Sequence, residues 1–197
     1  MTSTAREQTI PLAVILVSTT VAVGGLTSTI AGWAFMNSAI IGVAGAFVIA
    51  MGARRFELLL GESIACSMLG FVLLGGVATA GAPSPAAYVG FVDGLFNGWS
   101  DFLSSTAPVD LTDQFRVLPF TIGWWSVVIG TETLRRSTLP LAPLAGPLTG
   151  LTATLLLTVG DPRVAQLEGL TMTAGALILL NRRAARGRPR GVDARPS

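Results

Sequence analysis

Long apolar stretches alternate along the chain with short segments that hold nearly all of its charges. Residues 9–53 carry no charge, a run too long for one membrane span and suited to two spans joined by a tight turn. Along the whole sequence, the same pattern predicts six apolar helices. They cover residues 10–31, 37–53, 57–80, 117–134, 139–159 and 164–181. The sequence therefore predicts an all-α, polytopic membrane protein that forms a six-helix transmembrane bundle.

Polar residues and prolines mark some of the predicted helix boundaries. Asn37 or Ser38 is suited to cap the second span. Pro143 and Pro147 are expected to kink the fifth span near its start, because a proline inside a helix removes a hydrogen bond and clashes with the preceding turn.

Small residues at helical spacing predict where the helices pack closely. Gly42, Ala46 and Ala50 form a stripe in the second span, and Gly146 and Gly150 form a GxxxG pair in the fifth. Both patterns let the backbones of neighbouring membrane helices approach each other.

The charged residues predict the orientation of the bundle. All 13 basic residues are arginine. With both termini in the cytoplasm, every arginine except Arg116 and Arg163 falls on the cytoplasmic side, and the reverse orientation reverses this bias. We therefore predict a multi-pass protein of the cell (inner or plasma) membrane. Residues 1–181 form the transmembrane domain, and residues 182–197 form an arginine-rich cytoplasmic tail that is expected to be disordered.

The longest segment between predicted spans, residues 81–115, is extracytoplasmic in this orientation. Ser84 is suited to cap a helix that has Pro85 in its first turn, and this helix is predicted at residues 84–103. Apolar side chains recur along it at helical spacing, namely Tyr88, Phe91, Val92, Leu95, Phe96, Trp99, Phe102 and Leu103. Polar residues occupy much of the opposite side, namely Asp93, Asn97, Ser100 and Asp101.

This extracytoplasmic amphipathic helix carries too much aromatic surface to remain in water. We expect it to lie across the outer ends of the spans, where its acidic side disfavours anionic lipid. Tyr88, Phe91, Phe96 and Trp99 are the predicted interaction surface.

Composition excludes several kinds of chemistry. The chain has no His, the commonest metal ligand and general base. Its one cysteine, Cys66, lies in an apolar run and is expected to be a small packing residue. There is no phosphate-binding glycine loop, no metal-ligand spacing and no basic face for nucleic acid. We therefore expect no enzyme, no cofactor, no metal and no nucleic-acid partner. The expected partners are the lipid bilayer and a membrane or extracytoplasmic protein.

Four residues within predicted spans are candidates for an intramembrane function. Ionisable groups are rare at such depth and usually face a cavity or a partner. Glu62 fits this description, although contact with the membrane interface or a pair with Arg55 also explains it. Glu168 either faces such a site or complements the N-terminus of the sixth span. Trp124 and Trp125 either line a pocket or pack against lipid and neighbouring helices.

Glu132 has a local explanation. It precedes Arg135 and Arg136 by one helical turn, a spacing at which opposite charges pair on one helix face. We therefore predict an ion pair at the end of the fourth span.

Residues 95–157 carry three features in order. An amphipathic segment leads into the motif Thr106-Ala107-Pro108-Val109, a span ends in Arg135-Arg136, and the proline-rich residues 139–144 begin the next span. Together they resemble the N-terminal transmembrane region of actinobacterial TgpA-type transglutaminase-like membrane proteins. The arginine-, alanine-, glycine- and proline-rich composition is likewise typical of a GC-rich genome. In that family, catalysis is assigned to an extracytoplasmic domain with Cys, His and Asp. Because this chain has no His, no catalytic residue carries over.

The resemblance implies a multi-pass membrane anchor or assembly module without its own catalytic domain. The alternative is a small transporter subunit, such as the substrate-binding component of a vitamin or metal uptake system. Such a subunit needs several polar side chains that converge in the outer half of the bundle. Glu168, Thr171, Trp124 and Trp125 are available there.

Overall fold

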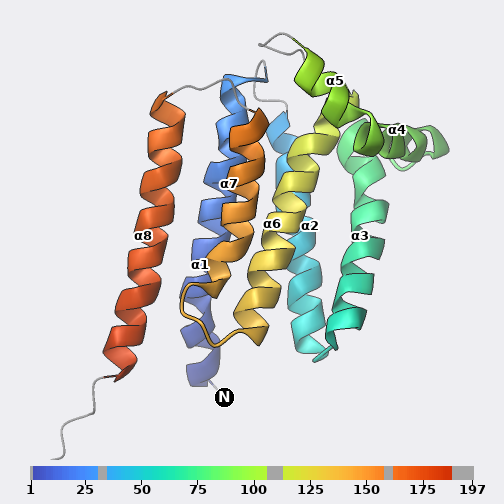
Figure 1. Ribbon diagram of the computed structural model, residues 1–197. Coiled ribbons are helices and arrows are strands. Elements are labelled where there is room, and N and C mark those ends of the chain that lie inside the picture. Colours follow the sequence, from blue (N-terminus) through green and yellow to red (C-terminus); the bar gives the residue numbers. More distant parts are fainter. Residues whose placement is uncertain (1, 31–34, 106–112, 158–161, 188–197) are drawn as a thin grey trace, which may run out of the picture.

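The protein is built from helices (Figure 1). The computed structural model describes residues 2–30, 35–105, 113–157 and 162–187, and these ranges contain no strand. The elements in chain order are α1 (Thr2–Gly24), η1 (Gly25–Ser28), α2 (Phe35–Arg55), α3 (Leu60–Ala80), α4 (Pro85–Phe96), α5 (Gly98–Ser104), η2 (Asp113–Arg116), α6 (Val117–Arg136), η3 (Ala142–Leu144), α7 (Ala145–Leu157) and α8 (Pro162–Gly187), where η marks a short 3-10 helix. The predicted all-α class is confirmed.

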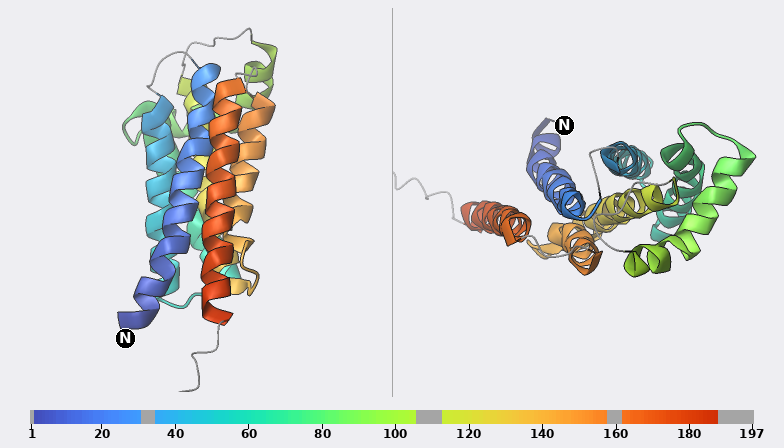
Figure 2. Two further views of the ribbon diagram at one scale, coloured as in Figure 1. Left: turned by 90° about the vertical axis from the view of Figure 1, so that its left-hand side faces the viewer. Right: turned by 90° about the horizontal axis from the view of Figure 1, so that it is seen from above.

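The long helices lie side by side, and the short pair α4–α5 lies at one end of them. The axes of α1, α2, α3, α6, α7 and α8 are roughly aligned, and α8 lies at the edge of the bundle (Figure 1, Figure 2). We call the pair α4–α5 the platform, and its end of the bundle the platform end. The opposite end, called the arginine end, holds the last turns of α2 and α6 with Arg54, Arg55, Arg135 and Arg136.

Three described helices are long and apolar enough to cross a membrane. These segments are Thr9–Thr27, Phe35–Arg55 and Leu60–Ala80, and they indicate a membrane-embedded protein. The apolar segment Ala142–Leu157 is shorter. Its helix α7 has 13 residues, or about 20 Å of length, against about 30 Å of hydrocarbon in a bilayer. The three later predicted spans therefore remain predictions.

Helix α6 is the centre of the bundle. It packs against α1, α2, α3 and α7. A Cβ added at Gly146 of α7 would overlap the carbonyl oxygen of Ser126, and one added at Gly150 would overlap the Ser126 hydroxyl. On the α2 side, a Cβ added at Gly42 would overlap the carbonyl oxygen of Phe120. Small residues therefore set the spacing of these helices, as the sequence predicts.

The starts of α2 and α7 differ from the prediction. Ser38 lies inside α2, where its hydroxyl donates to the carbonyl oxygen of Phe35 at 2.7 Å, so neither Asn37 nor Ser38 caps this helix. Pro143 lies in η3, and Pro147 lies in the first turn of α7. A first-turn proline lacks an N–H that would have no partner within the helix anyway. The prolines therefore delay the start of α7 rather than kink it.

The predicted helix at residues 84–103 is divided into α4 and α5 at Asn97. Ser84 caps α4 as predicted. The Asn97 side chain donates to the Asp93 carboxylate at 2.6 Å, one helical turn back, which supports the last turn of α4 rather than its continuation past Asn97. Gly98 follows, and its low helix propensity favours the break.

The last helix is longer than predicted. Helix α8 continues past Asn181 to Gly187, so the first part of the predicted disordered tail is helical. Residues 188–197 and the motif Thr106-Ala107-Pro108-Val109 lie outside the described residues.

Replacing Gly146 with Ala tests the contact between α6 and α7. The added methyl group would overlap the backbone of α6, so we expect the free energy of unfolding to fall by about 1–3 kcal/mol. Gly169→Ala is the control, because a Cβ there meets nothing within 4 Å and Ala favours a helix by about 0.5–1 kcal/mol over Gly. Thermal unfolding in detergent should give a lower midpoint for the first variant and not for the second. Equal midpoints would contradict the close contact.

Candidate functional site

An aromatic cluster joins the platform to the bundle. The Phe91 ring of α4 makes T-shaped contacts with Phe71 of α3 and Phe120 of α6, at centroid distances of 5.3 and 5.8 Å. Gly75 leaves room for this ring, because a Cβ there would overlap it. Trp124 extends the cluster, 5.7 Å from Phe71 and 5.6 Å from Phe120. Such ring pairs contribute about 0.5–1.5 kcal/mol beyond their buried area. The cluster therefore fixes α4 on the bundle.

The two tryptophan candidates have apolar surroundings. Trp124 is fully buried in the aromatic cluster, and its indole N–H has no hydrogen-bond partner among the described residues. Trp125 is half-buried, with its ring centroid 5.6 Å from that of Phe71. Such surroundings agree with the alternative in which the two tryptophans pack against lipid and neighbouring helices.

The predicted interaction surface is divided between buried and exposed side chains. Phe91 is 1% exposed. Tyr88 is half-buried, and its hydroxyl donates to the carbonyl oxygen of Leu73 at 3.2 Å. Trp99 is half-buried against a core cluster of the platform end. Phe96, by contrast, is 79% exposed. Further apolar side chains of the platform are exposed as well, namely Val89, Val92 and Leu103.

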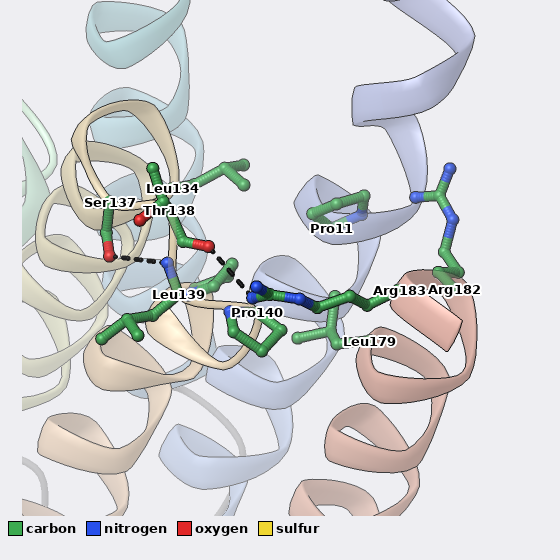
Figure 3. A pocket seen from close by; sticks show the side chains of 10 residues that line it. Pro11, Leu134, Ser137, Thr138, Leu139, Pro140, Leu179, Arg182 and Arg183 are labelled. Atoms are coloured by element: carbon green, nitrogen blue, oxygen red, sulfur yellow. Dashed lines mark hydrogen bonds between the residues drawn. The ribbon is translucent and has the colours of Figure 1, made fainter. Parts of the chain in front are cut away.

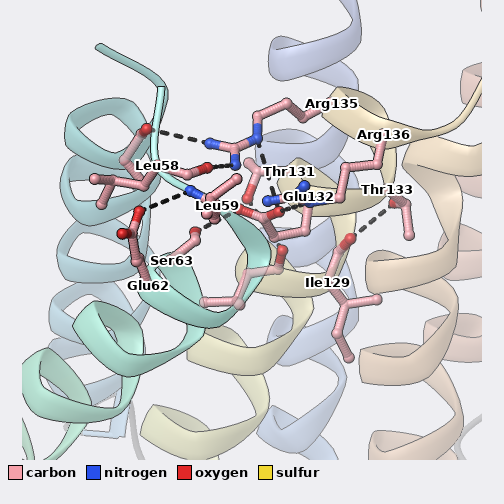
Figure 4. Close-up of polar contacts among 12 residues, drawn as sticks. Leu58, Leu59, Glu62, Ser63, Ile129, Thr131, Glu132, Thr133, Arg135 and Arg136 are labelled. Carbon is pink, nitrogen blue, oxygen red and sulfur yellow. Dashed lines mark hydrogen bonds and ion pairs between the residues drawn. The ribbon is translucent and has the colours of Figure 1, made fainter. Parts of the chain in front are cut away.

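At the arginine end, Glu132 joins α3 to α6 (Figure 4). The Ser63 hydroxyl donates to Glu132 Oε1 at 2.5 Å, and Arg136 Nε donates to Oε2 at 2.7 Å. Arg135 Nε lies 3.8 Å from the same carboxylate, so the predicted ion pair is confirmed. Arg135 also donates to the carbonyl oxygen of Ala53 at 3.1 Å, where a cation complements the C-terminus of α2. This network connects three helices and accounts for Glu132 structurally.

Glu62 belongs to the first turn of α3. Its side chain is exposed, and its carboxylate accepts a hydrogen bond from the backbone N–H of Leu59 at 2.9 Å. The helix begins at Leu60 rather than at Glu57 as predicted, because Glu57 adopts a left-handed turn conformation with φ of 53°. The later start places Glu62 at the helix end. The partner of Glu62 in the structure is therefore the backbone at the start of its own helix.

A pocket of about 450 Å³ opens at the arginine end (Figure 3). Arg182 and Arg183 line it beside the apolar side chains of Pro11 and Leu179. Arg183 donates to the carbonyl oxygen of Thr138 at 3.2 Å. Basic side chains next to an apolar wall suit an anionic lipid headgroup. The sequence did not predict this pocket, because it forms where the loop after α6 meets α8.

Glu168 is buried at the platform end. Only 2% of its surface is exposed, and its Oε1 has no hydrogen-bond partner within the described part of the chain. A Cβ added at Gly25 would overlap this oxygen and would lie 2.9 Å from Thr154 Cγ2. Helix α8, η1 and α7 therefore meet at the carboxylate. Thr171 does not join them, since its hydroxyl donates to Leu167 of its own helix at 2.8 Å.

Gly25 and Thr154 were not among the predicted site residues. The glycine pair that interrupts the first apolar stretch is the sequence feature that could have indicated a close contact at Gly25. Cys66 is exposed on α3, so its predicted packing role is wrong. Within the described ranges, no group of three or more His, Cys, Asp or Glu residues could hold a metal ion.

No protein-family model, curated protein or solved structure matches the chain. The resemblance to TgpA-type membrane proteins therefore rests on the sequence motifs alone.

Phe91→Ala should destabilise the protein by about 3–5 kcal/mol, because it empties a buried ring site. Phe96→Ala is the matched control on the same helix, since that ring is 79% exposed, and we expect it to change the unfolding midpoint little. Trp99→Ala should have an intermediate effect, because this side chain is half-buried. Thermal unfolding in detergent measures all three. If Phe91→Ala and Phe96→Ala behaved alike, the cluster would not be what fixes the platform.

Proposed function

We propose that the chain is a multi-pass membrane anchor or assembly module, similar to the membrane part of TgpA-type proteins and without catalysis of its own. The observation that carries this proposal is the platform. Its inner side is fixed to the bundle through Phe91, while its outer side leaves Phe96 and other large apolar side chains exposed. A rigid support with an exposed apolar surface is typical of a protein-binding site.

The proposed topology has six spans with both termini in the cytoplasm. The arginine pairs of α2 and α6 support it, because they lie at the same end of the bundle as the arginines of α8. That end faces the cytoplasm under the positive-inside rule. The platform is then extracytoplasmic, and the partner that it binds is a membrane protein or an extracytoplasmic protein.

A small transporter subunit is the second candidate function. The buried carboxylate of Glu168 beside Thr154 favours it, since intramembrane acids commonly mark ion or substrate pathways.

Single cysteines in a Cys66→Ser background test the topology. The positions are Ala82 before the platform, Thr138 at the arginine end and Ser197 at the C-terminus. Ala82 is preferred to Ser84, because Ser84 caps α4. A membrane-impermeant thiol reagent on intact cells should label position 82 alone. Labelling at 138 or 197 with protection at 82 would reverse the orientation.

A photo-crosslinking amino acid at position 96 tests the assembly role in the native host. Because Phe96 is exposed on the platform, we expect a specific adduct with one membrane or extracytoplasmic protein, identified by mass spectrometry. The same amino acid at the buried position 91 is the control and should give no intermolecular adduct. Adducts with lipid alone at position 96 would refute the assembly role.

A further inference from the structure

The pocket at the arginine end takes no part in the proposed assembly role, because the platform lies at the other end of the bundle. Its volume of about 450 Å³ is within the range of about 300–1,000 Å³ that is typical of small-ligand sites. Three parts of the chain form its walls, namely α1, the segment from the end of α6 to η3, and the end of α8 (Figure 3). Because these parts are distant in sequence, the pocket exists only in the folded bundle.

The pocket is basic. Arg182 and Arg183 line it, and the lining residues that the structure describes include no Asp or Glu. Arg183 is exposed, and its Nη1 donates to the carbonyl oxygen of Thr138 at 3.2 Å, which holds the guanidinium at the pocket (Figure 3). A guanidinium has five N–H donors, so this bond leaves donors for a ligand. Since the planar donor fork of arginine matches the oxygen atoms of a phosphate, the pocket suits a phosphate group.

The depth of the pocket matches the level of lipid headgroups. The first candidate membrane span begins at Thr9, and Pro11 of the same helix lines the pocket. On α8, Leu179 lines it from the apolar part of the helix, and Arg182 and Arg183 follow within the next turn. Arginine side chains that follow an apolar segment reach the membrane interface. The phosphate groups that occur at this level are those of phospholipids.

The pocket also has apolar walls, which a free phosphate would leave uncovered. Pro11, Leu139 and Leu179 contribute to them, and Leu139 is 69% exposed. An apolar groove of about 270 Å³ lies between α1 and α8. Its lining residues include Ile10 and Ile178, each directly before a pocket residue of the same helix. The two helices therefore offer apolar surface to the acyl chains of a lipid whose headgroup occupies the pocket.

We propose that this pocket binds the headgroup of an anionic phospholipid. Arg182 and Arg183 contact the phosphate, and the acyl chains lie against α1 and α8. Such a lipid connects α8, at the edge of the bundle, to α1 and to the segment after α6. The lipid site is independent of the proposed assembly role, which depends on the platform.

Native mass spectrometry of the purified full-length protein in detergent tests the lipid site. Phosphatidylglycerol and phosphatidylcholine with the same acyl chains are titrated separately at one ionic strength, and the dissociation constant of the first bound lipid is measured. We expect phosphatidylglycerol to bind several-fold more tightly, because its headgroup carries no cation to oppose the arginines. Inorganic phosphate at the same concentration should not displace it, because a free phosphate does not cover the apolar walls.

Arginine variants connect the lipid preference to the pocket. Arg183→Gln should weaken the binding of phosphatidylglycerol about five-fold, the factor expected for one basic residue near anionic lipid, and should leave that of phosphatidylcholine unchanged. Arg55→Gln is the matched control, because Arg55 is also exposed at the arginine end but does not line the pocket. Arg182→Gln removes the second arginine of the pocket and gives an independent result if Arg183→Gln lowers the unfolding midpoint.

Three results would overturn the lipid site. Equal affinity for the two lipids would show that the pocket does not select a negative headgroup. Equal weakening in Arg183→Gln and Arg55→Gln would assign the preference to the charge of the whole arginine end. Displacement of phosphatidylglycerol by inorganic phosphate would make a free phosphate the ligand.

Discussion

The close approach of neighbouring helices to α6 is the constraint on which the other contacts depend. Lipid is as apolar as the side chains that it touches, so membrane helices associate through dense packing more than through removal of apolar surface from water. Gly42 and Gly146 bring α2 and α7 to the backbone of α6. Helix α6 in turn presents Phe120 and Trp124 to the aromatic cluster that holds α4. The platform is therefore positioned by glycines that lie in other helices.

The two ends of the bundle treat a carboxylate in opposite ways. Glu132 at the arginine end has hydrogen bonds from Ser63 and Arg136. Glu168 at the platform end has one oxygen without a partner among the described residues. A satisfied polar network makes a structure specific, whereas a partly satisfied one is costly in an apolar interior. The contacts of Glu132 thus explain why a carboxylate lies there, while no described contact of Glu168 Oε1 offsets the free-energy cost of its burial.

Features set by local sequence could be predicted, and features set by tertiary contacts could not. Hydropathy located the long helices, and residue spacing located the ion pair of Glu132 and the close contact at Gly146. Both Phe91 and Phe96 were assigned to one apolar side, yet only Phe91 meets the space beside Gly75 on another helix. The importance of Glu168 depends likewise on Gly25 and Thr154, which are distant in sequence. The spacing of apolar residues describes one helix and does not indicate the surface of the neighbouring helix against which it packs.

The position of Glu168 on the last helix has a consequence for biogenesis. Helix α8 stands at the edge of the bundle and packs against α1, α7 and the two short turns η1 and η3. An acidic side chain that enters the bilayer on an isolated helix costs a few kcal/mol, and the elements that bury Glu168 all come earlier in the chain. In the proposed six-span topology, insertion in the order of synthesis would present α8 with a prepared surface, whereas escape of α8 would return the acid to lipid. In that topology, Glu168 makes α8 hard to insert alone and equally hard to remove from the bundle after insertion.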